Sequence, residues 1–455
     1  MVELFILLLF VCLILALLSG FPVALAIGGS AFLVATIASY FGVYDMVMMG
    51  AIPGRIYSVM TNETLVAIPL FVFMGAVLER SRIAENLLTT MSHLFGSLPG
   101  GLGVAVIVVG ALLAASTGVV GATVVAMGLI SLPVMRRAGY SQELSSGLIC
   151  ASGSTAQIIP PSTVLILLGV MLQDANTQAM LSQGIFSGAS FSITDLFAAA
   201  LIPGVLLVVL YLVTMGIWAF FKPTSCPPIR MNVEERRTLL KRVALTMLPP
   251  LVLIVLVLGS ILAGIATATE SAALGGVGAC ILAVLGRQFS WRVLREAAQS
   301  ALNISVMIFT ILIGATIMSL VFRQMGGEDV ILNVMEAIPG GLFGATLLVL
   351  FVMFILGFML DTFEIIFIIV PVFVPPLIIL GVDPLWFGVV AAIVLQTSYL
   401  TPPFGYAIFY LQGAVSGLDL KAVYRGVVPF VGLQLLCVVL IWVWPNLALW
   451  LPAFL

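Results

Sequence analysis

Long apolar segments, separated by short polar ones, follow one another along the whole chain. A helix needs roughly 20 apolar residues to cross the hydrocarbon core of a bilayer. Uncharged segments of about this length, or close to twice it, occur at 4–44, 64–78, 94–135, 144–173, 196–221, 243–269, 271–286, 297–322, 337–360, 384–418 and 426–455. Because few polar segments between them exceed about 20 residues, we expect no separate soluble domain. The pattern predicts an all-α polytopic membrane protein.

The first apolar segment is similar to a secretion signal but differs from one in two respects. No basic residue precedes it, and the apolar run continues past Gly20, Phe21 and Pro22 as far as Tyr44 without a charge. A cleaved leader has a basic start and a shorter apolar core. We therefore expect two membrane spans joined by a tight turn.

Composition supports a membrane protein and argues against other classes. Of 455 residues, 62% are hydrophobic and 8% are charged, which is too little charge to cover a soluble domain. The net charge of -2 argues against nucleic-acid binding. The five cysteines form no CxxC pair and His93 is the single histidine, so we expect no transition-metal site.

The positions of lysine and arginine orient the spans, because cytoplasmic loops carry an excess of both. The segment 222–242 holds six of these residues and is placed in the cytoplasm. The loop 174–195 has aspartates but no basic residue, as expected outside, and Arg136 and Arg137 fall inside again. Successive segments of the chain therefore alternate between the two faces.

The segment 94–135 does not fit a single crossing. Arg80 before it and Arg136 after it are both expected in the cytoplasm. A segment with both ends on one face must enter the membrane and return. We predict a re-entrant helical hairpin with its tip near 116–118.

The segment 337–382 predicts a second hairpin. It lacks basic residues, and it must start and end outside because the next span, 384–418, has to reach the cytoplasm at Lys421. This hairpin therefore opens from the opposite face. The complete scheme has roughly ten crossings and two hairpins, with both termini outside. Arg55 and Arg323 are the two basic residues that it places on the outer side.

The two hairpin regions are similar in sequence. Leu-Pro-Gly-Gly-Leu at 98–102 matches Ile-Pro-Gly-Gly-Leu at 338–342, and polar segments that end in Pro-Pro follow at 152–161 and 396–403. Each half thus contains a span, a hairpin, a broken span and a span, and the halves begin on opposite faces. Inverted repeats with interrupted helices are typical of secondary transporters, which bind substrate and ions where the interruptions meet.

Each Pro-Pro pair is expected to break its helix in mid-membrane, because proline lacks an N–H group and biases the preceding residue away from helix. Unwound backbone at that depth persists only where it is buried in protein or lines a cavity. Its carbonyls, with Ser and Thr hydroxyls, are hard oxygen ligands for Na⁺, and a helix N-terminus can meet an anion. A proline kink with its serines bonded to neighbouring helices is the structural alternative. The repetition of the motif favours a functional break.

Asp361 and Glu364 lie in an otherwise apolar segment at the second hairpin tip. A carboxylate there costs at least about 2.5–3.5 kcal/mol, and residues three apart share one face of a helix. We interpret the pair as a cation ligand or proton carrier, with a structural cap of the hairpin tip as the alternative. Glu270 instead fits a cap at the start of its helix.

The two breaks and the two tips supply the predicted binding residues. The predicted sodium-binding residues are Ser116, Thr117, Gly118, Gly121, Ser152, Gly153, Ser154, Thr155, Ile159, Pro160, Gly357, Asp361, Thr397, Ser398, Thr401 and Pro402. The predicted substrate-binding residues are Ser154, Thr155, Gln157, Ser162, Thr362 and Gly405. No lysine or arginine lies mid-span, so bound cations, helix N-termini or hydroxyls would have to neutralise an anionic substrate.

Several motifs resemble the large membrane subunit of tripartite ATP-independent periplasmic (TRAP) transporters, over nearly the whole chain. They are Ala-Ile-Pro-Leu-Phe at 67–71, Pro-Val-Met at 133–135 with Gly-Tyr at 139–140, Ile-Pro-Pro-Ser at 159–162, Ala-Thr-Ala-Thr-Glu-Ser-Ala at 266–272, the spaced Gly357, Asp361, Pro371 and Pro375, and Thr-Pro-Pro-Phe-Gly at 401–405. The resemblance implies a fixed scaffold and a moving transport domain, which work as an elevator. It also implies sodium coupling without ATP, a small four-helix membrane subunit, a periplasmic substrate-binding protein, and organic acids as substrates.

We therefore predict the large permease subunit of a sodium-coupled, binding-protein-dependent carboxylate importer in a bacterial inner membrane, with no enzymatic activity. The predicted organisation has scaffold helices at 1–63, a first repeat at 64–221, a cytoplasmic connector with scaffold helices at 222–296, and a second repeat at 297–455. The chain lacks the HExxH and GxSxG patterns of a hydrolase, and a channel needs no opposed hairpins. A stand-alone organic-anion symporter coupled to Na⁺ or H⁺ is the remaining alternative.

Overall fold

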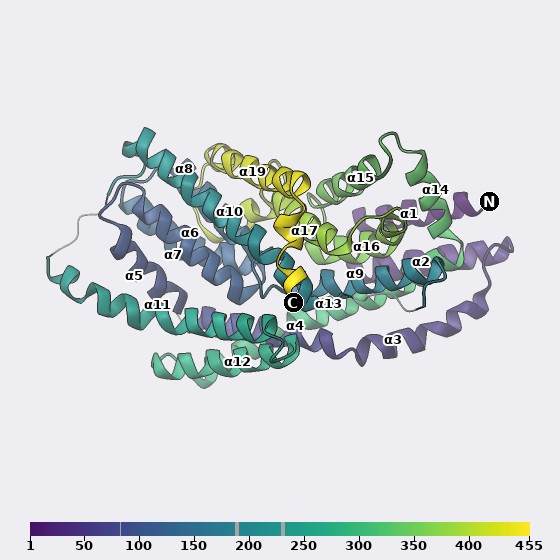
Figure 1. Ribbon diagram of the computed structural model, residues 1–455, viewed down its shortest axis with the longest axis horizontal. Helices are drawn as coiled ribbons and strands as arrows, with labels where there is room; N and C mark the ends of the chain where they lie inside the picture. The colour runs from purple at the N-terminus through teal and green to yellow at the C-terminus, as the bar shows by residue number, and fades with distance from the viewer. Residues whose placement is uncertain (82, 187–190, 229–232) are drawn as a thin grey trace.

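The computed structural model describes residues 1–81, 83–186, 191–228 and 233–455 (Figure 1). Helices dominate these residues, and none of them forms a strand. The α-helices are α1 (Val2–Leu18), α2 (Val23–Tyr40), α3 (Ile52–Met60), α4 (Ala67–Arg80), α5 (Ile83–Phe95), α6 (Gly101–Thr117), α7 (Val120–Arg137), α8 (Gln142–Ser154), α9 (Thr163–Ser182), α10 (Ile193–Phe221), α11 (Val233–Leu262), α12 (Ala268–Leu285), α13 (Trp291–Gln324), α14 (Gly327–Ala337), α15 (Gly341–Leu356), α16 (Thr362–Ile379), α17 (Pro384–Leu400), α18 (Tyr406–Ala414), α19 (Leu420–Val443) and α20 (Asn446–Leu449).

Many of these helices have the length and apolar composition of membrane-spanning helices. Within the described residues, 9 are long and apolar enough, or up to 11 spans if each of two sharply bent helix pairs is one span. The prediction of an all-α, multi-pass membrane protein is confirmed. The turn predicted near the N-terminus is also present, at 19–22 between α1 and α2.

The first predicted hairpin is formed by α6 and α7, which pack against each other and meet at Gly118 and Val119. Gly118 has a φ of 61°, a left-handed conformation that allows the chain to reverse and that other residues rarely adopt. The segment 155–162 then separates α8 from α9 and contains the first Pro-Pro pair. The first break therefore lies where the prolines predict it.

The second half of the chain repeats this arrangement. The segment 357–361 separates α15 from α16, and the segment 401–405 separates α17 from α18. The peptide bonds 160–161 and 402–403 are both cis. A hairpin followed by a broken helix thus occurs twice, in the same order. The predicted sidedness of the two hairpins stays a prediction.

Three segments differ from the sequence analysis. α9 continues to Ser182, so much of the loop expected at 174–195 is helical. α13 covers 34 residues and exceeds the span expected at 297–322. A further helix, α14, precedes the second hairpin. Charged residues marked the ends of the expected spans, but a helix makes its backbone hydrogen bonds internally and can continue beyond the hydrocarbon into water.

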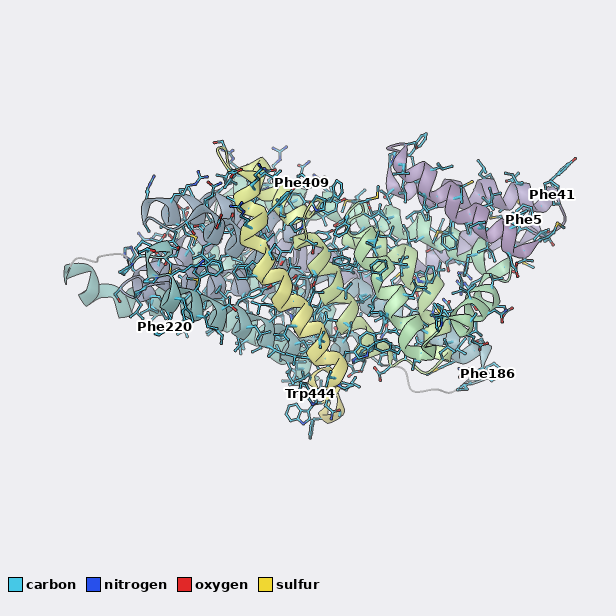
Figure 2. The ribbon with its side chains drawn as sticks, turned by 90° about the horizontal axis from the view of Figure 1, so that it is seen from above. Phe5, Phe41, Phe186, Phe220, Phe409 and Trp444 are labelled. Atoms are coloured by element: carbon cyan, nitrogen blue, oxygen red, sulfur yellow. The ribbon has the colours of Figure 1, made fainter. Side chains whose placement is uncertain are left out.

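The helices pack in two groups that also contact each other, since α4 packs against α6 and α13 against α16. In one group α2 and α4 lie against α13, and α12 lies against α4. In the other, α8 packs against α19 and α9 packs against α16. Figure 1 shows α6, α7 and α8 at one end of the molecule and α14, α15 and α16 towards the other, with α17 between them. In Figure 2, α19 crosses the molecule obliquely and Trp444 projects beyond the body at its end.

The contact between α8 and α19 is made backbone to backbone. Gly147 faces Gly426, and a Cβ atom added at Gly426 would collide with the carbonyl of Glu143. Small residues allow membrane helices to approach this closely, which maximises dispersion contacts. Gly432, on the same helix, has no neighbour within 4 Å of such a Cβ atom. Gly426 is therefore a packing glycine, whereas Gly432 is an exposed one.

We predict that Gly426→Ala destabilises the protein and that Gly432→Ala does not. The methyl group at 426 has to push α8 and α19 apart, and overpacking of this kind costs about 1–3 kcal/mol. Replacing an exposed helical glycine by alanine instead stabilises by about 0.5–1 kcal/mol. Thermal unfolding of the purified protein in detergent compares the two variants. A midpoint for Gly426→Ala at or above that of the wild type would contradict the close contact.

Candidate substrate and ion site

The hairpin tips and the helix breaks meet around a cavity of about 450 Å³. Its polar lining residues are Gln157, Asp361, Thr362, Glu364, Tyr399, Tyr406 and Tyr410. Apolar side chains of α1, α2 and α13 close the remaining side. We call this space the tip cavity. Both repeats and the N-terminal helices therefore contribute to one chamber.

The second hairpin tip carries its two acids as a helix cap. Asp361 is the N-cap residue of α16, and its side chain accepts a hydrogen bond from the backbone N–H of Thr362 at 2.8 Å. Glu364 completes a capping box, because its Oε2 accepts from the backbone N–H of Asp361 at 3.0 Å. The two acids were expected on one helix face, but Asp361 precedes the helix. Both carboxylates nevertheless line the cavity, so the cap and a role in binding are compatible.

Tyr399, in the last turn of α17, holds the tip from the other side. Its hydroxyl donates a hydrogen bond to Asp361 Oδ1 and accepts one from the backbone N–H of Thr362 at 2.7 Å. Tyr406, at the start of α18, donates to the carbonyl of Met359 at 2.7 Å. The second break is thereby tied at two points to the second hairpin tip.

The three tyrosines of the cavity were absent from the predicted site. Tyr406 lies beside both Tyr399 and Tyr410, with ring centroids 5.1 and 6.2 Å apart. Tyr406 and Tyr410 are four residues apart on α18, the spacing of one helix face, whereas Tyr399 lies on α17, before the second Pro-Pro pair. The sequence signal that could have identified these tyrosines is the presence of phenol hydroxyls next to an expected helix break.

The first break contacts both tips. Gln157 Nε2 donates a hydrogen bond to Thr362 Oγ1 at 2.7 Å, which joins the first break to the second hairpin. Thr163 Oγ1 donates to the carbonyl of Gly118 at 2.8 Å, which joins α9 to the first hairpin. The Oε1 atom of Gln157 is buried and has no hydrogen-bond partner among the described residues. Gln157 therefore has an acceptor left for a ligand.

The predicted site residues divide into two sets. The set that lines the tip cavity is Gly118, Gly121, Gln157, Asp361 and Thr362. The set that lies outside its lining is Ser152, Gly153, Ser154, Thr155, Ile159, Pro160, Ser162, Gly357, Thr397, Ser398, Thr401, Pro402 and Gly405. The side chains of Ser116 and Thr117 lie outside the described part of the structure.

Most of the predicted hydroxyls donate to a nearby backbone carbonyl. The bonds run from Ser154 to Ala151, Thr155 to Ser152, Ser162 to Gln157, Thr397 to Ile393, Ser398 to Leu395 and Thr401 to Thr397, at 2.6–3.0 Å. A donating hydroxyl keeps its lone pairs, so these oxygens can still accept or coordinate. Their role as sodium ligands stays a prediction.

The second hairpin and the second broken helix also approach closely at Gly357. A Cβ atom added there would collide with the side chain of Ser398. Glycine at this position therefore allows the end of α15 to lie against α17, next to the buried Thr397 and Ser398. Within the described chain, no three His, Cys, Asp or Glu side chains gather as a metal site. A cation at the second tip would meet the Asp361 carboxylate together with carbonyl and hydroxyl oxygens, all of which suit hard ions.

Comparison with known proteins decides the family. Residues 7–447 match the family described as the tripartite ATP-independent periplasmic transporter, DctM component. This chain belongs to the DctM family. The TRAP resemblance seen in its motifs is thereby confirmed, and so is the assignment to transport rather than catalysis.

Named DctM relatives cover almost the same length. The C4-dicarboxylate TRAP transporter large permease protein DctM of Pseudomonas aeruginosa is 28% identical over 406 residues, which cover 88% of this chain and 89% of the relative. The sialic acid TRAP transporter large permease protein SiaM of Vibrio cholerae is 27% identical over 439 residues, covering 96% of each. The ectoine/5-hydroxyectoine TRAP transporter large permease protein UehC of Ruegeria pomeroyi is 28% identical over 443 residues, covering 97% of each.

A solved structure shares the fold of this DctM-family chain. The YdaH transporter of Alcanivorax borkumensis matches it with a TM-score of 0.61 at 15% sequence identity, over 89% of each chain. This likeness concerns the arrangement of helices alone. It agrees with the all-α polytopic architecture described above.

We predict that Tyr399→Phe destabilises the protein more than Tyr410→Phe. The first change removes a hydroxyl that bonds Asp361 and the Thr362 N–H, and losing a hydrogen bond to a charged group costs about 1.5–3 kcal/mol. The hydroxyl of Tyr410, in the same cavity, has no bond to another described residue. Thermal unfolding of both variants measures the difference. Equal midpoints would show that Tyr399 does not hold the tip.

Proposed function

We propose that the chain is the large permease subunit of a sodium-coupled, binding-protein-dependent secondary transporter that imports an organic acid. The observation that carries this is the hydrogen bond from Gln157 to Thr362, which joins the broken helix of one repeat to the hairpin tip of the other around one cavity. Transporters built from repeats bind their substrates at such junctions.

The charge of the tip cavity supports coupling to a cation. Asp361 and Glu364 are its acids, and no lysine or arginine is among its described lining residues. An organic anion entering this chamber would be repelled unless cations came with it. Sodium bound near the second tip would remove the repulsion, so that anion and cation bind together. The Tyr399 hydroxyl would keep the Asp361 carboxylate oriented both with and without bound sodium.

Helix N-termini offer the complementary place for the anion. The N-caps of α7, α9 and α18 are Val119, Ser162 and Gly405, and none of them makes a side-chain capping bond. The first turns of these three helices contribute Val120, Val164 and other residues to the cavity lining. Uncapped N–H groups and the helix dipole favour negative charge. We place the substrate carboxylate at these three helix starts and the cation at Asp361.

The remaining parts of the proposal follow from family membership. A small four-helix membrane subunit and a periplasmic substrate-binding protein would complete the transporter, which would lie in a bacterial inner membrane. The group α6 to α9 with α15 to α19 would move as the elevator against α2, α4, α12 and α13. Relatives are named for C4-dicarboxylates, sialic acid and isethionate, which share a carboxylate or sulfonate group. We propose an organic anion of this kind as the substrate.

Sodium dependence is the first expected property. The chain, reconstituted in vesicles with its small subunit and the binding protein, should take up substrate only with an inward sodium gradient. Uptake should also stop when the binding protein is omitted. Undiminished uptake in sodium-free buffer at neutral pH would point to protons, and uptake without the binding protein would favour a stand-alone symporter.

We also expect Asp361→Asn to reduce sodium-driven uptake by about tenfold or more while the protein stays folded. Asparagine is as good an N-cap as aspartate, so the change removes the charge and keeps the cap. A hydrogen bond or ligand contact to a charged group contributes about 1.5–3 kcal/mol, which sets the size of the loss. Asp361→Ala should lower both uptake and thermal stability.

Asp383→Asn is the matched control for this change. Asp383 is the N-cap of α17 and accepts from the backbone N–H of Trp386 at 2.9 Å, far from the tip cavity lining. This variant should transport like the wild type. If Asp361→Asn also transported at the wild-type rate, with the same sodium dependence, Asp361 would be a cap and nothing more.

A further inference from the structure

A second polar cavity lies away from the hairpin tips. It has a volume of about 410 Å³ and is lined by α3, α9, α13 and Pro371 of α16. Its charged residues are Arg55 on α3, Arg323 on α13 and Asp174 on α9. Two positive groups thus face one negative group in the lining, and the carboxylate of Glu328 on α14, outside the lining, also interacts electrostatically with Arg323. We call it the arginine cavity.

The two arginines of this cavity are not neutralised by direct ion pairs. Within the described part of the chain, neither Arg55 nor Arg323 takes part in an ion pair. Arg323 donates from Nε to the carbonyl of Ser319 at 3.2 Å. The Oε1 atom of Gln178, also in the cavity lining, is buried without a hydrogen-bond partner among the described residues. The cavity therefore presents charged donors and a free acceptor to whatever enters it.

Helix α13 connects this cavity to the tip cavity. Its 34 residues span roughly 50 Å at about 1.5 Å per residue. Arg323 lies at one end, Ile304 and Met307 line the tip cavity in the middle, and Arg292 lies at the other end. One helix thus forms part of the wall of both chambers. Met307 and Arg323 are separated by roughly 24 Å along this helix, at about 1.5 Å per residue.

The predicted topology gives these arginines an unusual place. Arg55 and Arg323 are the two basic residues that it assigns to the outer side, where membrane insertion disfavours lysine and arginine. The presence there of two guanidinium groups without an ion-pair partner is therefore not explained by membrane insertion or by ion pairing. Guanidinium binds carboxylate and sulfonate groups strongly because it offers several N–H donors in one plane.

We propose that the arginine cavity is an outer anion-binding site that receives the carboxylate or sulfonate of the incoming substrate before it reaches the tip cavity. This inference rests on the proposed transport of an organic anion. Asp174 acts in it as an internal competitor for Arg55 and Arg323. Because Asp174 lies on α9, which starts at the tip cavity, a shift of α9 along α13 would move this carboxylate towards or away from the arginines.

Charge-selective labelling tests this site without requiring transport. Ser58 lines the cavity and is exposed, whereas Thr61 is exposed near the end of the same helix outside it. Ser58→Cys and Thr61→Cys are made in a chain whose five cysteines are replaced by alanine. Intact cells are treated with two membrane-impermeant methanethiosulfonate reagents, one carrying a sulfonate and the other a trimethylammonium group. The ratio of their reaction rates reports the local potential at each thiol.

The sulfonate reagent should be favoured at position 58 over position 61 by about tenfold, the low end of electrostatic focusing in a cleft. Arg55→Gln with Arg323→Gln should bring the ratio at 58 down to that at 61, and Asp174→Asn should raise it. Free succinate or isethionate should slow the sulfonate reaction at 58. The proposal would be overturned by equal rate ratios at the two positions, or by a ratio at position 58 that does not change when the arginines are replaced. Labelling at position 58 only from the cytoplasmic side would also overturn it.

Uptake measurements separate this proposal from the transport function. In the reconstituted transporter, Arg55→Gln and Arg323→Gln should raise the KM for substrate several-fold and change the maximal rate little, while Asp174→Asn should lower KM. A purely structural role would lower the maximal rate in all three variants. Unchanged KM values in a transporter that works would remove the arginine cavity from the path. A wild type without sodium-driven uptake would instead refute the proposed function and leave the labelling result standing.

Discussion

Backbone that is not helical in the middle of a membrane has to find its hydrogen-bond partners in the protein, and the structure is organised around this constraint. Side chains of each broken helix supply partners to the backbone of a hairpin tip. Thr163 of the first broken helix bonds the first tip at Gly118, and Tyr399 of the second bonds the second tip. The bond from Gln157 to Thr362 then joins the two halves. Removing any of these contacts would leave a polar group of a tip or a break without its protein partner.

The same arrangement separates charge within the tip cavity. One helix start, that of α16, is capped by acids of its own sequence, whereas the starts of α7, α9 and α18 have no side-chain cap. The first would favour a cation and the other three an anion. Two opposite ligands can therefore occupy neighbouring places and stabilise each other. This is the electrostatic basis on which substrate and sodium would bind as a set.

Helix α13 gives the molecule a continuous wall beside these chambers. It packs against α2 and α4, and its successive turns line the arginine cavity and the tip cavity. A long helix is stiff, so the groups along it keep fixed distances while the helices opposite can shift. The arginine cavity, at one end of α13, carries two positive side chains, and the tip cavity, beside its middle, carries two acids. The two cavities therefore differ in the sign of their charge. In the proposed scheme, an anion held at the first place would move to the second once cations had reduced the negative charge there.

Sequence by itself determined the features that depend on local chemistry. Apolar length marked the spans, the missing N–H groups of Pro160-Pro161 and Pro402-Pro403 marked the breaks, and small residues near Gly118 marked a hairpin tip. The tertiary structure decided which side chains meet. Gln157 and Thr362 are 205 positions apart and Tyr399 and Asp361 are 38 apart, and a hydrophobic pattern shows that a face is buried without showing its partner. It also decided that Asp361 caps α16 rather than lying on its face, because a cap is defined by backbone geometry that spacing alone does not fix.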